Sequence, residues 1–147
     1  MNYLLDTNIL LVYLRATAQR DIIEQRYDPF GSANNPIISV VNVGEIKSIA
    51  KRNYWGHKRL ALLDEILNEL IITDINSEDV IEMYAEIDAF SQGKLKDKPL
   101  ATSARNMGKN DLWIASTAAV IGATLLTSDR DFDHLHDQYL DVAHVEM

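Results

Sequence analysis

The 147-residue sequence contains no cysteine. Disulfide scaffolds, thiol nucleophiles, iron–sulfur clusters and cysteine-ligated zinc are therefore excluded, and any bound metal must be held by carboxylates or histidines. Long hydrophobic runs are also missing, because the longest stretches, such as 9–14 and 118–126, are too short or too interrupted to cross a bilayer. No basic segment leads into a hydrophobic one, as it does in a signal peptide. We expect a cytoplasmic protein that does not contact a membrane.

Several catalytic signatures are absent as well. The sequence has no Gly-x-Ser-x-Gly elbow, no Walker A loop and no paired-glycine dinucleotide fingerprint. These absences argue against a serine hydrolase, a kinase and a Rossmann oxidoreductase. The chain also lacks internal repeats and linkers, and 47% of its residues are hydrophobic. This apolar content is enough for one globular domain spanning residues 1–147.

Basic residues are outnumbered, since 14 Lys and Arg stand against 22 Asp and Glu, for a net charge of −8. An acidic balance is at first sight unfavourable for binding a polyanion. The basic residues are concentrated, however, in segments 47–59 and 94–109, which contain five each. Both segments can be solvated surface, or they can flank an acidic centre and bind a polyanion there. In the second case Lys51, Arg52 and Lys58 are the candidates for contacts with phosphate groups of the polyanion.

Strand and helix patterns alternate along the chain. Apolar and β-branched runs predict strands at 2–5, 37–41, 70–73, 124–127 and 140–145. Three-to-four spacing predicts helices at 9–14, 42–50, 58–69, 77–90 and 111–120. The expected N-caps are Asn42, Asn76 or Ser77, and Asn110, and Gly122 is expected to end the last helix. Strands separated by helices require crossover connections, so we expect an α/β fold with three layers, α/β/α, around a central parallel sheet.

Acidic residues stand where the expected strands end. Asp6 follows the first strand, Glu45 lies in the first turn after the second, Asp111 opens an Ala-rich helix, and Asp129 follows the strand at 124–127. In open α/β sheets the functional crevice lies beyond the carboxyl ends of the strands, so all four side chains should face one crevice. Taken singly, each has a structural explanation, because acids stabilise helix N-termini and can form capping boxes.

Four carboxylates in one crevice would repel one another, which raises their pKa values and destabilises the fold. A positive group is therefore expected among them. Hard divalent cations prefer oxygen ligands, and Mg²⁺ uses few carboxylates while keeping several waters. Such a site can activate water and stabilise charge on a phosphate. A second metal candidate, His134-x-His136 between Asp133 and Asp137, has the composition of a solvated loop.

Four motifs contain these acids, and in this order they resemble the motifs of PIN-domain proteins, in particular the VapC-type toxin ribonucleases. The motifs are LLDTNIL at 4–10, SVVNVGEI at 39–46, NDLWIA at 110–115 and LTSDRDF at 126–132. The resemblance extends from Asn2 to Phe132. It implies a PIN-like fold and a Mg²⁺- or Mn²⁺-dependent endoribonuclease, with catalytic carboxylates at Asp6, Glu45, Asp111 and Asp129.

The chemistry of the site assigns roles to these carboxylates. Asp6 is the expected direct metal ligand, with Asp111 beside it. Glu45 and Asp129 are expected to bind metal through water or to orient the attacking water. The expected metal-binding residues are therefore Asp6, Asp111 and Asp129. No catalytic histidine accompanies the four motifs. Water rather than the ribose 2′-hydroxyl should therefore attack the RNA, leaving 5′-phosphate and 3′-hydroxyl ends.

Neighbouring polar residues supply the remaining candidates. Thr7, Asn8 and Thr127 have short side chains that can hydrogen-bond the carboxylates and hold them in place, or can serve turn geometry alone. Asp131 and Asp133 lie close to Asp129, so the residue that supplies the last carboxylate is open.

The resemblance also implies partners: an RNA substrate, a cognate antitoxin that shields the acidic crevice, and a second copy of the chain in a homodimer. Apolar positions around Ile49 and Trp55 are the expected contact surfaces. Two other function classes require residues that differ from those present. A catalytically silent PIN-like module that binds RNA or protein would lack some of the four acids, and none is missing. A receiver-like domain needs a lysine late in the chain, and no lysine follows Lys109. A phosphohydrolase with an aspartate nucleophile needs a second aspartate two residues after Asp6, and position 8 is asparagine.

Overall fold

The computed structural model describes residues 1–15 and 17–147 and contains a five-stranded sheet. The strands are β1 (Asn2–Leu5), β2 (Asn35–Ser39), β3 (Ile71–Thr73), β4 (Thr124–Thr127) and β5 (Asp141–His144). Their order is β3-β2-β1-β4-β5, and all neighbouring strands are parallel. The predicted α/β architecture with a central parallel sheet is therefore confirmed.

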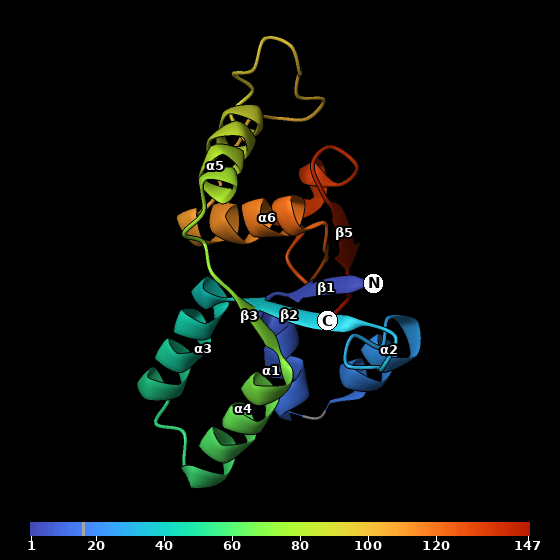
Figure 1. Ribbon diagram of the computed structural model, residues 1–147, viewed down its shortest axis with the longest axis vertical. Coiled ribbons are helices and arrows are strands. Elements are labelled where there is room, and N and C mark those ends of the chain that lie inside the picture. Colours follow the sequence, from blue (N-terminus) through green and yellow to red (C-terminus); the bar gives the residue numbers. More distant parts are fainter. Residues whose placement is uncertain (16) are drawn as a thin grey trace.

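Helices cover both faces of the sheet and form the two outer layers (Figure 1). One face carries α1 (Thr7–Arg15), α2 (Ala18–Arg26), α3 (Val40–Arg52) and α4 (His57–Glu69). The other carries α5 (Glu78–Ser91), α6 (Lys109–Ile121) and the short 3₁₀ helix η1 (Arg130–Leu135). None of these helices is long and apolar enough to span a bilayer in the part of the chain that the structure describes.

Two apolar cores lie on either side of the sheet because successive strand residues point to opposite faces. Leu5 and Leu126 pack into the core beneath α1–α4, whereas Leu4 and Leu125 pack into the core beneath α5 and α6. Burial on both faces explains why adjacent residues of these strands, Leu4-Leu5 and Leu125-Leu126, are both apolar instead of alternating with polar ones. It also holds the carboxyl ends of β1 and β4 side by side, since Leu5 pairs with Leu126.

Several local predictions need correction. Helix α3 begins at Val40 with Ser39 as its cap, whose Oγ accepts a hydrogen bond from the amide of Val41 (3.1 Å). Asn42 is therefore not a cap but a buried residue of the first turn. The last long helix begins at Lys109 after Gly108, so Asn110 lies inside it and is not its cap.

Other boundaries agree with the sequence pattern or have a clear physical cause. Ser77 caps α5 through a hydrogen bond from the amide of Val80, and Gly122 ends α6 with a φ of 67°, the left-handed conformation that glycine adopts without strain. Helix α2 was not predicted. Its only buried residue is Ile23, so its sequence has little apolar periodicity.

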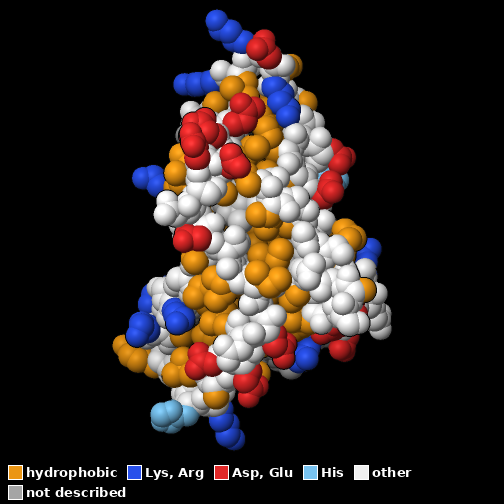
Figure 2. All heavy atoms as spheres, in the orientation of Figure 1, with side chains coloured by type: hydrophobic (Ala, Val, Ile, Leu, Met, Phe, Trp, Pro, Cys, Tyr) orange, Lys and Arg blue, Asp and Glu red, His pale blue; other side chains and the backbone are white. Residues whose placement is uncertain are grey.

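Strand β3 lies at an open edge of the sheet, and that edge faces the viewer in Figure 1. In the same orientation, Figure 2 shows apolar side chains across the middle of the molecule, acidic ones over α5 and basic ones over α3. Ile71, Ile72 and Ile81 are each about half exposed on the chain surface. Exposed apolar residues on an unpaired edge strand are typical of a surface that another chain covers.

Candidate functional site

The four predicted carboxylates lie at one edge of the sheet. Asp6 sits at the junction of β1 and α1, and Asp129 follows β4, the neighbouring strand. Asp111 comes from the first turn of α6, and Glu45 comes from the second turn of α3 because this helix begins at Val40, earlier than predicted. The N-terminal ends of the two helices meet at this edge (Figure 1). The crossover topology thus gathers into one crevice side chains that are more than a hundred residues apart in the sequence.

Asp6 is the most enclosed of the four, with 7% of its surface exposed. Its Oδ1 accepts a hydrogen bond from the backbone amide of Thr7 (2.8 Å), and its Oδ2 accepts one from the Oγ1 of Thr127 (2.7 Å). The amide group of Asn42 donates a longer one to Oδ1 (3.4 Å). Donors on both oxygens fix the orientation of this carboxylate before any ligand arrives.

Glu45 is tied to Asp6 through a small network. Thr7 Oγ1 donates to Glu45 Oε1 (3.0 Å) and accepts from Asn42 Nδ2 (3.0 Å). The same Nδ2 lies 3.4 Å from Glu45 Oε1. Asn42 therefore presents its two donor hydrogens to a group of oxygens that would otherwise face one another. The sequence pattern predicts Asn42 only as a helix cap, because a polar residue three positions before a glutamate is typical of a capping box.

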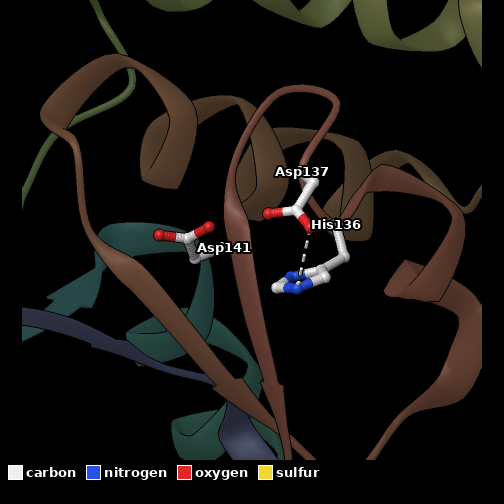
Figure 3. A group of neighbouring side chains, drawn as sticks. All are labelled: His136, Asp137 and Asp141. Atoms are coloured by element: carbon white, nitrogen blue, oxygen red, sulfur yellow. Dashed lines mark ion pairs between the residues drawn. The ribbon is translucent and has the colours of Figure 1, made fainter.

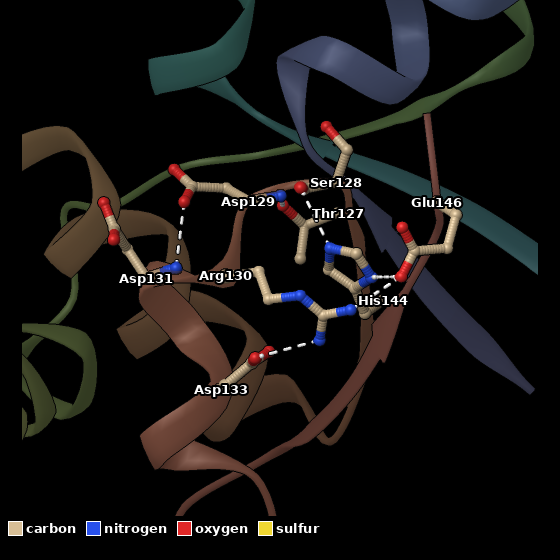
Figure 4. A network of polar contacts seen from close by, with 8 residues as sticks. All are labelled: Thr127, Ser128, Asp129, Arg130, Asp131, Asp133, His144 and Glu146. Atoms are coloured by element: carbon tan, nitrogen blue, oxygen red, sulfur yellow. Dashed lines mark hydrogen bonds and ion pairs between the residues drawn. The ribbon is translucent and has the colours of Figure 1, made fainter. Parts of the chain in front are cut away.

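The segment after β4 places one more carboxylate in the crevice and turns another away (Figure 4). The Asp129 amide donates to Thr127 Oγ1 (3.0 Å), and Asp129 Oδ1 accepts from the Asp131 amide (2.9 Å). Carboxylate oxygens of Asp111, Asp129 and Asp131 lie within 4.8 Å of one another. Asp133 instead pairs with Arg130 (3.2 Å). Asp131, which the sequence left open, therefore lies with the cluster.

The electrostatics of the crevice are those of crowded negative charge. Burial, together with the smaller effects of the charges on Asp6 and Asp129, raises the pKa of Asp111 to about 7. Burial also raises the pKa of Asp6, against the hydrogen bonds from Thr127 and Thr7 that lower it. Ionising Asp6 and Asp111 therefore costs free energy in the folded protein.

The donor set fits a hard divalent cation. Asp111, Asp129 and Asp131 offer oxygen ligands at mutual distances that one ion can bridge, with Asp6 and Glu45 beside them. Among residues 1–15 and 17–147, no ion pair within 4.0 Å involves any of these five acids. A carboxylate cluster without a cationic side chain is a site whose charge must be balanced from outside the chain.

Comparison with known proteins agrees with this geometry. The family model described as "PIN domain" matches residues 3–137. The chain belongs to the PIN domain family. Ribonuclease VapC2 of Haemophilus influenzae is 24% identical to this PIN domain over 136 residues, 92% of each chain. The fold is also that of VapBC2 from Rickettsia felis (TM-score 0.70, 22% identity, 98% of both chains) and of a toxin–antitoxin complex from Klebsiella pneumoniae (TM-score 0.68, 21% identity, 99% of both chains).

The three predicted supporting residues of the PIN domain differ in their positions. Thr7 and Thr127 both hydrogen-bond Asp6 or its neighbour Glu45, as described above. Asn8 is exposed, and no side-chain hydrogen bond involves it in the described chain (residue 16 apart). The structure therefore gives Asn8 no contact with the carboxylates.

The three predicted RNA-binding residues point in different directions. Arg52 lines a groove that also contains Glu45 and Asn110, so this residue is continuous with the crevice. Lys51 lines a separate cavity between α3 and α4. Lys58 is exposed near the beginning of α4. Of the three, Arg52 alone shares a surface with the acids.

The two histidines of the His134-x-His136 motif do not converge. His134 Nε2 lies 2.7 Å from Ser91 Oγ, against α5. His136 lies with Asp137 and Asp141 on the surface (Figure 3), but its Nδ1 accepts a hydrogen bond from the Val142 amide (2.9 Å). The neutral ring must then carry its proton on Nε2, which leaves no free nitrogen lone pair for a metal.

Proposed function

We propose that the protein is a divalent-metal-dependent endoribonuclease and the toxin of a toxin–antitoxin pair. The observation that carries the proposal is the cluster of five carboxylates at one sheet edge, without a cationic partner in the described chain. Membership of the PIN domain family and full-length similarity to a VapC ribonuclease support it. Mg²⁺ is the proposed ion, and Mn²⁺ has the same preference for oxygen ligands and open coordination positions.

The residues of the crevice can hold an ion and its water. Asp6, Asp111, Asp129 and Asp131 are the proposed carboxylates around the metal, and Glu45 is placed to orient the attacking water. A bound divalent ion supplies a lowered pKa for its water and positive charge beside the phosphate. Water then attacks phosphorus, the bond from phosphorus to O3′ breaks, and the departing oxygen takes a proton. The products are a 3′-hydroxyl and a 5′-phosphate.

Positioning of Asp6 is the main contribution of the surrounding fold. The Thr7 amide and Asn42 donate to Oδ1, whereas Thr127 alone donates to Oδ2, so Oδ2 keeps a lone pair for a metal. Preorganised ligands bind metal more tightly because less conformational freedom is lost on binding.

An antitoxin partner is part of the proposal. The similar structure from Klebsiella pneumoniae is a toxin–antitoxin complex, and a free ribonuclease would harm the cell that makes it. The simplest inhibitor for this crevice is a segment that carries Arg or Lys, whose cation takes the place of the metal among the carboxylates. Such a segment can be disordered until it binds.

A homodimer is also proposed, and the β3 edge offers it more exposed apolar surface than the expected positions around Ile49 and Trp55, which are half-buried. Trp55 packs against the core cluster and lies under the Arg59 guanidinium (5.1 Å), so little of it is free for a partner. The β3 edge, with Ile71, Ile72 and Ile81, is the more exposed apolar surface. We propose this edge as the contact between two copies.

The function is tested by expressing the chain in bacteria and by incubating purified protein with total RNA. Expression alone should arrest growth, and Asp6→Asn should restore it. RNA should be cleaved with Mg²⁺ and remain intact with EDTA. A folded wild-type protein that leaves RNA intact in Mg²⁺ and Mn²⁺ would contradict the enzymatic assignment and favour a binding module.

A further inference from the structure

A groove runs from the acidic crevice along α3, between this helix and the N-terminal end of α6. Glu45 and Asn110 lie at its crevice end, where Asn110 is the neighbour of Asp111. Arg52 lies at the other end, seven residues after Glu45, which corresponds to about 10 Å along the helix. The groove encloses about 630 Å³. It is therefore large enough for a small organic group and is open to the proposed reaction centre.

The lining combines one cation with apolar walls. Arg52 is the cationic member of the lining within the described residues, and its Nε donates to Ser48 Oγ (3.3 Å), on the same face of α3. Ile75 and Trp113 form apolar surface. A guanidinium at the end of an apolar slot matches an aromatic group that carries a phosphate.

Trp113 is held in place by a neighbouring aromatic ring. Its ring packs against Tyr84 with 4.3 Å between ring centroids, and the side chain is partly buried while it lines the groove. An indole that is already immobilised loses little entropy when a base stacks against it. Base–aromatic stacking contributes about 1–3 kcal/mol per base and does not depend strongly on sequence.

Gly44, in the first half of α3, is part of the lining of the groove. A Cβ built at this position meets nothing within 4 Å. Glycine is unfavourable inside a helix, and here no close approach or positive φ in the structure requires it. What Gly44 provides is open space beside Glu45.

We propose that this groove binds one nucleotide of single-stranded RNA next to the cleaved phosphate. Its base lies against Trp113 and Ile75, Asn110 hydrogen-bonds the base or ribose, and Arg52 binds the adjoining phosphate. The proposal rests on the proposed ribonuclease function and deepens it. Insertion of a base requires that it be unstacked, so the groove selects single strands or loops over duplex RNA.

Binding is measured through Trp113 itself. The chain has two tryptophans, so Trp55→Phe in the inactive Asp6→Asn background leaves Trp113 as the reporter. The probe is a pool of random-sequence 12-nucleotide RNAs in buffer with Mg²⁺. Single-stranded RNA should quench the fluorescence of Trp113, and the same pool annealed to its complement should quench it at least tenfold less at equal concentration.

Two variants and one control separate groove binding from general attraction. Arg52→Ala and Gly44→Phe, made in the binding background and in the active enzyme, should weaken RNA binding and lower kcat/KM about tenfold or more. Gly44→Phe fills open space, so circular dichroism and thermal unfolding should show a folded protein. The control Arg26→Ala removes the same type of side chain from the last turn of α2, away from the groove, and should change neither RNA binding nor kcat/KM.

Each remaining outcome decides between occupants. If wild type cleaves RNA and both groove variants bind and cleave as it does, the groove is not an RNA site, while the ribonuclease function stands. If Gly44→Phe instead lowers the mass of the protein in light scattering, a second copy occupies the groove and the proposal is wrong. If wild type neither cleaves RNA nor quenches with it, the ribonuclease function fails together with the groove.

Discussion

Asp111→Asn should stabilise the metal-free protein at pH 8 and should stabilise it much less at pH 4.5. Burial and neighbouring carboxylates raise the pKa of Asp111 from 3.8 to about 7 in the folded chain. A group with a raised folded pKa binds its proton more tightly in the folded state, so its contribution to stability is lost as pH rises from about 4 to about 7. Above that range the ionised side chain destabilises the fold.

The magnitude follows from the two pKa values. A difference of about three pH units corresponds to about 4 kcal/mol at full ionisation. Because the side chain is partly exposed, solvent screening reduces this to about 2 kcal/mol. The variant also loses the favourable interaction of a negative charge with the N-terminus of α6, which reduces the gain in the free energy of unfolding by roughly 0.3–1 kcal/mol. For a domain of this size the net gain corresponds to an increase in Tm of about 3–6 °C at pH 8.

Thermal unfolding followed by circular dichroism measures the effect, in EDTA at pH 4.5 and pH 8, and then with MgCl₂ at pH 8. Mg²⁺ should raise the Tm of wild type by binding only the folded state, and should raise that of Asp111→Asn less, so that the difference shrinks or reverses. If wild type is the more stable protein at pH 8 in EDTA, the carboxylates do not repel one another and the reasoning is refuted.

Two further substitutions test how the carboxylates are held. Thr127→Val removes the donor to Asp6 Oδ2 and should raise the Mg²⁺ concentration for half-maximal RNA cleavage about 10–100-fold, whereas an unchanged Mg²⁺ dependence would show that Thr127 only shapes the turn. Asn42→Ala leaves Asp6 and Glu45 without a shared donor, so RNA cleavage should fall about tenfold while Asn42→Ser retains part of it; equal rates for both variants and wild type would remove Asn42 from the site.

Much of the fold is predictable because it depends on burial alone. The continuous apolar strands at 2–5 and 124–127 and the glycine at 122 have the same places in the structure as in the sequence prediction. The meeting of Asp6 with Asp129 follows from the same rule, since each comes directly after a buried parallel strand. Helix α2 escaped prediction because one buried isoleucine gives no periodic pattern.

Directions of neighbouring side chains were not predictable in the same way. Asp131 and Asp133 are two positions apart in η1, where three residues complete a turn, so they point to different sides. Lys51 and Arg52 are adjacent on α3 and separated by about 100° around its axis, which divides a basic segment into two surfaces. Such differences depend on where a helix begins and how it rotates against the sheet, and composition does not contain this information.

Cleavage of a defined RNA in ¹⁸O-labelled water tests the central claim most directly. With Mg²⁺ present, mass spectrometry of the fragments should show 5′-phosphates that contain one solvent oxygen and 3′-hydroxyl ends, and the same preparation of Asp6→Asn should yield no fragments. Fragments with 2′,3′-cyclic phosphates, or cleavage that persists in EDTA, would contradict a mechanism in which carboxylates hold a metal and water attacks the phosphate.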